Sequence, residues 1–134
     1  MTVVDDLVQW LGQQLDEDER IARAAAAAQG PVWWYKANLG GVDGRVLAGK
    51  VLDDGREVAL AEALTARSAA EGVHAACHDP ARVLRDIDAK RRIIDEAAEY
   101  EPGITGFPEM WTTLRLLALP YVDRPGYLES WRPE

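Results

Sequence analysis

The chain has 134 residues and a formal net charge of −8, with 48% hydrophobic and 28% charged residues. This length is typical of one domain, and the composition argues against intrinsic disorder, a collagen-like repeat or a disulfide scaffold. Duplex-binding domains usually carry a basic excess that neutralises phosphates, so the acidic balance argues against nucleic acids and anionic membranes as partners. The acidic charge instead favours solubility or a basic protein partner.

Cys77 is the one cysteine, so the chain can form no internal disulfide and contains no C-x-x-C motif. A reducing, cytoplasmic location fits this cysteine usage. No motif around Cys77 marks a catalytic nucleophile, and we expect a small helix-packing residue there. The first residues lack the basic-then-apolar pattern of a secretion signal, and no apolar run approaches the roughly 20 residues of a membrane span. We therefore expect a cytoplasmic protein without a membrane anchor.

The first expected element is a helix over residues 4–29. Apolar residues recur there at three- to four-residue spacing: Val4, Leu7, Val8, Leu11 and Leu15. This spacing predicts an amphipathic helix with one apolar face. Gly30 and Pro31 end it, because glycine suits the left-handed position after a helix and proline cannot continue one. The acidic run Asp16–Glu19 covers a full turn of this helix.

Residues 32–64 change character and predict a small antiparallel meander of two or three strands. The first segment is aromatic and β-branched, and a second, over 46–52, alternates loosely. Turn signals separate the segments: Gly40, Gly41, Asp43 and Gly44, then Asp53-Asp54-Gly55. Residues 56–64 can pair as a third strand, although their alanines also permit a helix. A sheet this small must pack one face on helices.

Two helices are expected next. The capping-box pattern of Ser68 to Glu71 predicts a short helix over residues 69–78. Asp79 is a good N-cap and Pro80 fits the first helical position, which predicts a longer helix over 80–100.

A final helix is expected over residues 108–119, where the side chains are apolar almost all round. We therefore expect this helix at the centre of the core. Arg115 is the one basic residue inside this apolar helix. We expect it either to pair with a carboxylate, Asp123 or Glu129, in a clamp on the tail, or to extend its guanidinium to solvent. The tail, 120–134, carries enough aromatic area to lie against the body of the protein.

Together these elements predict an α+β fold in a single domain, residues 1–134. A long N-terminal helix comes first, the antiparallel meander follows, and three helices and an aromatic C-terminal tail complete the chain. A chain of this length buries about two thirds of its unfolded surface, so it should fold alone.

Several motifs give the chain a family resemblance. They are His74-Ala-Ala-Cys-His78-Asp79-Pro80-Ala-Arg82-Val83-Leu84-Arg85, Ala89-Lys90-Arg91, Leu114-Arg115-Leu116-Leu117-Ala118-Leu119-Pro120-Tyr121, Trp131-Arg132-Pro133 and Leu15-Asp-Glu-Asp-Glu19. With them the chain resembles a family of small proteins of unknown function from actinobacteria and their phages. The sheet region departs from that family. Its members usually carry Gly-Pro-Trp after the first helix, whereas in this chain Val32 lies between Pro31 and Trp33. The resemblance implies the architecture and the source, and no reaction.

His74 and His78 are four positions apart, so on a helix they project from one face. Two imidazoles at that spacing can ligate a divalent metal ion, with Asp79 as a third ligand and the Asp16–Glu19 carboxylates nearby. This pattern gives the alternative function, a metal-dependent hydrolase. Against it, Asp79 is suited to capping a helix, a histidine in a last helical turn is favoured by the helix dipole, and no H-E-x-x-H motif is present.

Trp33, Trp34 and Tyr35 are the candidate binding residues. In a strand, Trp33 and Tyr35 share one face and Trp34 lies on the other. One face belongs to the core, and the other either is covered by a helix or presents an aromatic anchor to a partner. The leading hypothesis is a noncatalytic, acidic protein-interaction module without a cofactor. Its expected partner is a protein, basic in charge, and a second copy of the chain is another candidate.

Overall fold

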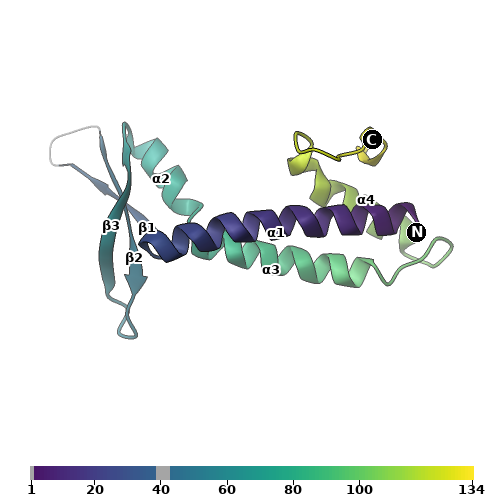
Figure 1. The fold of residues 1–134 in the computed structure, drawn as a ribbon, viewed down its shortest axis with the longest axis horizontal. Coiled ribbons are helices and arrows are strands. Elements are labelled where there is room, and N and C mark those ends of the chain that lie inside the picture. The colour runs from purple at the N-terminus through teal and green to yellow at the C-terminus, as the bar shows by residue number, and fades with distance from the viewer. Residues whose placement is uncertain (1, 39–42) are drawn as a thin grey trace. The chain divides into compact units, whose positions relative to one another are not determined.

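The fold of this computed structural model is α+β, as predicted, and its description covers residues 2–38 and 43–134 (Figure 1). The turn predicted at Gly40 and Gly41 lies outside the described residues. The elements follow in the order α1 (Val3–Gln29), β1 (Val32–Ala37), β2 (Gly44–Val51), β3 (Glu57–Ala66), α2 (Ala69–Cys77), α3 (Pro80–Ala97), α4 (Phe107–Ala118) and the 3₁₀ turns η1 (Leu119–Tyr121) and η2 (Glu129–Trp131).

The chain divides into two compact units. The sheet unit is Asp18–Asp86, and the helical unit combines the residues up to Glu17 with Ile87–Glu134. Helices α1 and α3 therefore each contribute residues to both units.

The sheet unit is built on three antiparallel strands in the order β1-β2-β3. Residues 56–64, for which the sequence permits strand or helix, lie mostly in β3, because pairing with β2 outweighs the weak helix preference of their alanines. The face that carries the buried Val46 and Ala48 of β2 packs against α2. Tyr35 of β1 pairs with Val46 on this face, and its ring lies so close to Gly72 of α2 that a Cβ there would be 2.1 Å from ring carbon Cδ2.

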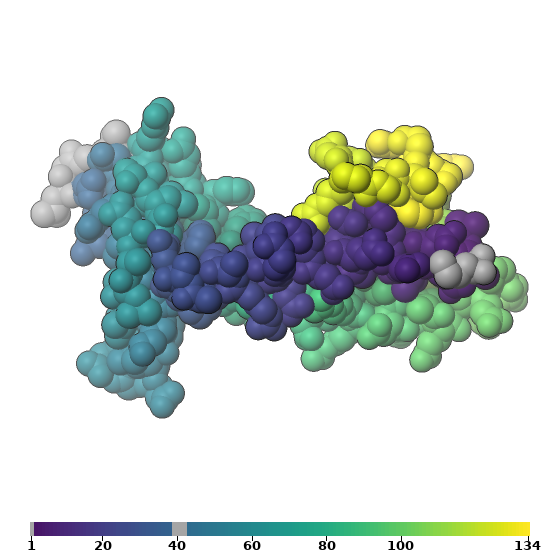
Figure 2. Space-filling view, viewed as in Figure 1, coloured from purple at the N-terminus to yellow at the C-terminus, as the bar shows by residue number. Residues whose placement is uncertain are grey.

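The helical unit packs the first half of α1 against α3, α4 and the tail. Its buried apolar residues are Val4, Leu7, Trp10, Leu11, Leu15, Ile87, Ile94, Ala97, Leu114, Ala118, Tyr121 and Trp131. Trp10 is the main contact with the tail: its Nε1 donates to the Pro125 carbonyl oxygen (3.0 Å), and its ring meets the rings of Tyr127 and Trp131. Figure 2 shows the C-terminal segment, in yellow, lying on the purple first part of α1. The tail lies against the body, as expected.

The expectation for α4 is wrong in one respect. Leu114 and Ala118, one turn apart, are buried, whereas Leu116 is 52% exposed and Leu119 is also exposed. A helix can be covered all round only when several elements surround it, and the helical unit has too few to do so. The leucine-rich sequence therefore forms one buried face and one exposed face.

Arg115 clamps the tail, but through a different partner from the one expected. Its Nη1 donates to the Arg132 carbonyl oxygen (3.4 Å), and its guanidinium lies 5.7 Å from the centroid of the Trp111 ring. Glu129, one of the two expected partners, instead forms an ion pair with Arg132. Arg132 Nε donates a hydrogen bond to Glu129 Oε1, and this bond raises the pKa of Arg132.

Candidate functional site

An apolar pocket of about 340 Å³ opens in the sheet unit. Its lining residues are Asp18, Ile21, Ala22 and Ala25 of α1, Trp33 of β1, His78 after α2, and Pro80 and Val83 of α3. This volume lies within the range of about 300–1,000 Å³ that ligand pockets occupy. Asp18 and His78 supply the polar groups among otherwise apolar walls.

Trp33 forms one wall of the pocket and is fixed by two hydrogen bonds. Its backbone N–H donates to Asp79 Oδ2 (3.1 Å), and its indole Nε1 donates to the Gly30 carbonyl oxygen (3.2 Å). Gly30 adopts φ +103°, and a Cβ there would be 2.3 Å from the Gly49 carbonyl oxygen, so the turn into β1 requires glycine. The turn that ends α1 thereby sets the position of the indole.

Asp79 joins β1 to α3. Its Oδ1 accepts from the Arg82 backbone N–H (2.8 Å), which is the N-cap predicted from sequence, while Oδ2 accepts from Trp33. The Ala81 N–H also donates to the Pro31 carbonyl oxygen (2.9 Å), so the first turn of α3 is tied to the start of β1. The Asp79 side chain is buried and both of its oxygens accept from backbone donors.

His74 and His78 lie side by side at the end of α2. Their ring centroids are 4.6 Å apart with an angle of 41° between the planes, and both residues are exposed. His78 Nδ1 donates to the His74 carbonyl oxygen (2.8 Å). Cys77 between them is exposed, so the expected helix-packing role is wrong. In the described part of the chain, no group of three or more His, Cys, Asp or Glu side chains is placed to hold a metal ion.

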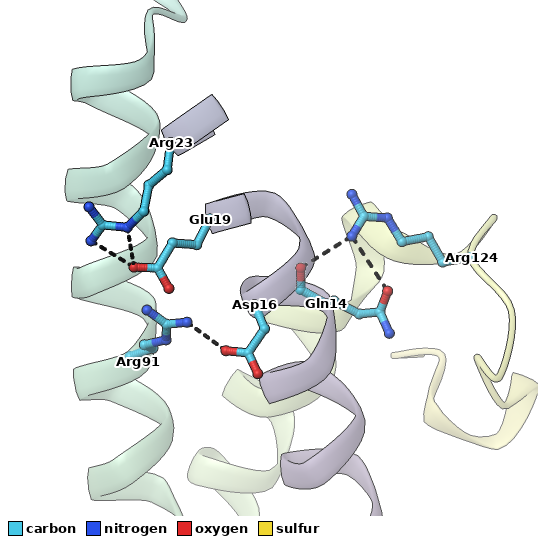
Figure 3. Close-up of polar contacts among 6 residues, drawn as sticks. All are labelled: Gln14, Asp16, Glu19, Arg23, Arg91 and Arg124. Carbon is cyan, nitrogen blue, oxygen red and sulfur yellow. Dashed lines mark hydrogen bonds and ion pairs between the residues drawn. The ribbon is translucent and has the colours of Figure 1, made fainter. Parts of the chain in front are cut away.

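The acidic run of α1 is distributed among different partners (Figure 3). Asp16 Oδ1 accepts from Arg91 Nη2 of α3 (2.6 Å), and Glu19 Oε1 accepts from Arg23 along α1 (2.9 Å). Asp18 is the member that lines the pocket. Two members of the run thus belong to separate ion pairs, and Asp18 lines the same pocket as His78.

The three consecutive aromatic residues of β1 separate as their alternation predicts. Trp33 lines the pocket, and Tyr35 packs against Gly72. Trp34 pairs with Leu47 of β2 on the other face of the sheet, and all three aromatic residues are half-buried. The sequence analysis identified Trp33 but missed the opposite wall. The one available signal was the alanine run of α1, whose short side chains leave room beside the indole.

The net charge is concentrated in the helical unit. That unit contains thirteen acidic and six basic residues, which give −7, whereas the sheet unit contains ten and nine, which give −1. The pocket therefore lies in the nearly neutral unit, and the acidic surface belongs to the other.

Comparison with known proteins gives a family and no activity. No helix in the described residues is both long and apolar enough to cross a membrane. No curated protein and no solved structure matches the chain. The model of a family of unknown function, DUF6221, matches residues 4–133, nearly the whole length. The chain therefore belongs to this family of unknown function.

Proposed function

We propose that this protein is a noncatalytic protein-interaction module, and the pocket beside Trp33 is the observation that carries this proposal. The pocket presents an indole wall together with Ile21, which is 52% exposed, and Val83. Binding energy at protein interfaces concentrates where an apolar or aromatic side chain enters such a recess. The occupant that fits is an apolar side chain of a partner protein.

The charge distribution supports a basic partner. The helical unit carries a net charge of −7, and a surface of one sign accelerates association with a partner of the opposite sign. The attraction is screened as salt is added. Partner binding should therefore weaken as ionic strength rises. The part of the affinity that comes from the pocket should change mainly when its apolar side chains are substituted.

The proposal also includes the origin of the protein and its location in the cell. The motifs around His74–Arg85 and Leu114–Tyr121 support an origin in actinobacteria or their phages, and the exposed thiol of Cys77 supports a cytoplasmic location. We favour this function over a metal-dependent hydrolase because the Asp79 oxygens, which would complete the metal site, hold the backbone N–H groups of Trp33 and Arg82.

The test uses two substitutions that place a carboxylate at equally exposed aliphatic positions. Ile21→Asp lies in the pocket and Leu116→Asp lies on α4, and both wild-type residues are 52% exposed. Wild-type and variant proteins are immobilised, incubated with host extract and compared by quantitative mass spectrometry. We expect Ile21→Asp to reduce capture of a basic protein at least about tenfold, equivalent to about 1.4 kcal/mol, and Leu116→Asp to leave it unchanged.

Two results would contradict the proposal. Equal capture by the Ile21→Asp variant and the wild type would remove the pocket from the interface. If the wild type alone forms a dimer in light scattering and Ile21→Asp restores the monomer, the occupant is a second copy of the chain and not a basic partner.

A further inference from the structure

We infer that His74 and His78 form a two-histidine binding site for a divalent late transition-metal ion of the Zn²⁺, Ni²⁺ or Cu²⁺ type. The site shares His78 with the lining of the docking pocket, whereas His74 does not line it, so substitutions at His74 test the metal site separately. Its two imidazoles are exposed on consecutive turns at the end of α2. Imidazole nitrogen is a preferred ligand of these ions, whereas Mg²⁺ and Ca²⁺ prefer oxygen.

The spacing of the two rings matches a shared ion. Zinc lies about 2.0–2.1 Å from a coordinating imidazole nitrogen, and so about 3.2 Å from the ring centroid. Two imidazoles on one tetrahedral ion therefore have centroids about 5 Å apart. The centroids of His74 and His78 are 4.6 Å apart. The observed separation is therefore close to the one that a shared ion requires.

One hydrogen bond prepares His78 for this role. A carbonyl oxygen can only accept, so the contact of His78 Nδ1 with the His74 carbonyl oxygen (2.8 Å) places the ring proton on Nδ1. The lone pair of the neutral ring is then on Nε2, the nitrogen that remains for a metal. Metal-binding histidines usually donate their other N–H to a carbonyl or carboxylate in this way, which fixes the tautomer and the ring orientation.

The backbone at the end of α2 holds His78 in place. Its N–H donates to the Ala75 carbonyl oxygen (3.1 Å), which makes His78 the C-cap of the helix. The neighbouring Asp79 is engaged by two backbone donors and stays outside the site. With two protein ligands, water molecules complete the coordination of the ion. Such a site binds more weakly than a closed structural site with four protein ligands.

The test measures metal binding by the tag-free full chain in isothermal titration calorimetry, with ZnCl₂, NiCl₂ and MgCl₂ as separate probes. We expect one Zn²⁺ or Ni²⁺ ion per chain and no binding of Mg²⁺. Substitution His74→Ala or His78→Ala should weaken Ni²⁺ binding at least about tenfold, and acidification should weaken it because protons compete for the same nitrogen lone pairs. Val73→Ala, on the same helix and 48% exposed in the wild type, should have no effect.

Cys77→Ser decides between two ligand sets. If this variant binds Ni²⁺ as the wild type does, the two imidazoles are the ligands. If Cys77→Ser alone abolishes binding, or if His74→Ala binds like the wild type, the inference is wrong. NMR provides a second readout: Ni²⁺ should first broaden the ring resonances of both histidines, and first broadening elsewhere would show an adventitious ion only. Because His74→Ala leaves the pocket intact, its result does not depend on the docking proposal.

Discussion

Asp79 makes two structural contacts with one side chain, since it caps α3 through Arg82 and holds β1 through Trp33. Asp79→Ala leaves two backbone N–H groups without their acceptor. Loss of an N-cap costs about 0.5–2 kcal/mol and an unsatisfied buried donor about 1–3 kcal/mol, so we expect a loss of about 2–4 kcal/mol in urea unfolding. Asp79→Asn should lose about half as much, because an amide offers one acceptor oxygen.

The control for this prediction is Asp88→Ala, which removes an exposed carboxylate of α3 that pairs with Arg92. Exposed pairs of this kind contribute about 0–1 kcal/mol. Equal losses from Asp79→Ala and Asp88→Ala would show that the two hydrogen bonds of Asp79 do not stabilise the fold. Equal losses from Asp79→Ala and Asp79→Asn would show that the negative charge matters and the number of acceptors does not.

The pKa of Asp5 leads to a prediction of how the stability of the start of α1 depends on pH. The backbone N–H and the hydroxyl of Thr2 both donate to Asp5 Oδ2 (2.9 Å each), and these bonds lower the pKa of Asp5 from its usual 3.8. A lowered pKa in the folded state means that the ionised carboxylate stabilises the start of α1 above pH 3.8, and that this stabilisation is lost as pH falls through the lowered value.

Thr2→Val, which keeps the backbone donor and removes the hydroxyl, should move the Asp5 titration measured by NMR upward, toward 3.8. Thr112→Val on α4 should leave it unchanged. An identical Asp5 titration in Thr2→Val and the wild type would exclude the hydroxyl as a cause of the shift.

At the scale of elements, substitution of a helical glycine by alanine should have opposite effects on the free energy of unfolding at two positions. Nothing lies within 4 Å of a Cβ added at Gly12 of α1, whereas one added at Gly72 of α2 would be 2.1 Å from the Tyr35 ring. Gly12→Ala should raise the free energy of unfolding by about 0.5–1 kcal/mol, because alanine is the better helix former. Gly72→Ala should lower it by about 1–3 kcal/mol through overpacking.

Thermal and urea unfolding of both variants measure this difference. The double variant Gly72→Ala with Tyr35→Leu, compared with Tyr35→Leu alone, should no longer show the penalty. If Gly72→Ala is instead as stabilising as Gly12→Ala, α2 does not pack closely on β1.

The elements that could be predicted from sequence are those fixed by local chemistry. The apolar spacing of α1, the Ser68 cap of α2 and the Asp79 cap of α3 all act within a few residues, and the structure has each of them. What could not be predicted depends on segments distant in the chain. The bond from Trp33 to Asp79, the carbonyl partner of Arg115 and the opposite wall of the pocket are set by packing between elements, and no local spacing encodes that packing.

At the scale of the whole molecule, the tail provides a probe of cooperativity. Trp131 is 2% exposed, and its indole Nε1, although buried, has no hydrogen-bond partner in the described structure. Trp131→Phe removes this unpaired N–H and keeps most of the apolar volume, so we expect a loss below about 1.5 kcal/mol. Trp131→Ala should lose about 3–5 kcal/mol, because it leaves a cavity against Trp10.

Hydrogen exchange of the Trp131→Ala variant also tests the prediction of a single domain. Because α1 and α3 each contribute to both units, we expect protection to fall at Leu7 in the helical unit and at Val46 in the sheet unit together. Loss of protection at Leu7 with Val46 unchanged would instead show that the two units unfold as separate domains.

The hydrogen bond from Trp33 to Asp79 has a consequence for self-association. β1 is an edge strand with the sequence Val-Trp-Trp-Tyr-Lys-Ala, rich in residues that favour strands. An open edge of this composition is a template on which a foreign strand can add, the first step toward aggregates. Asp79 occupies the Trp33 N–H and introduces a carboxylate at that edge. The residue that caps a helix therefore also occupies one of the backbone donors that an added strand would need.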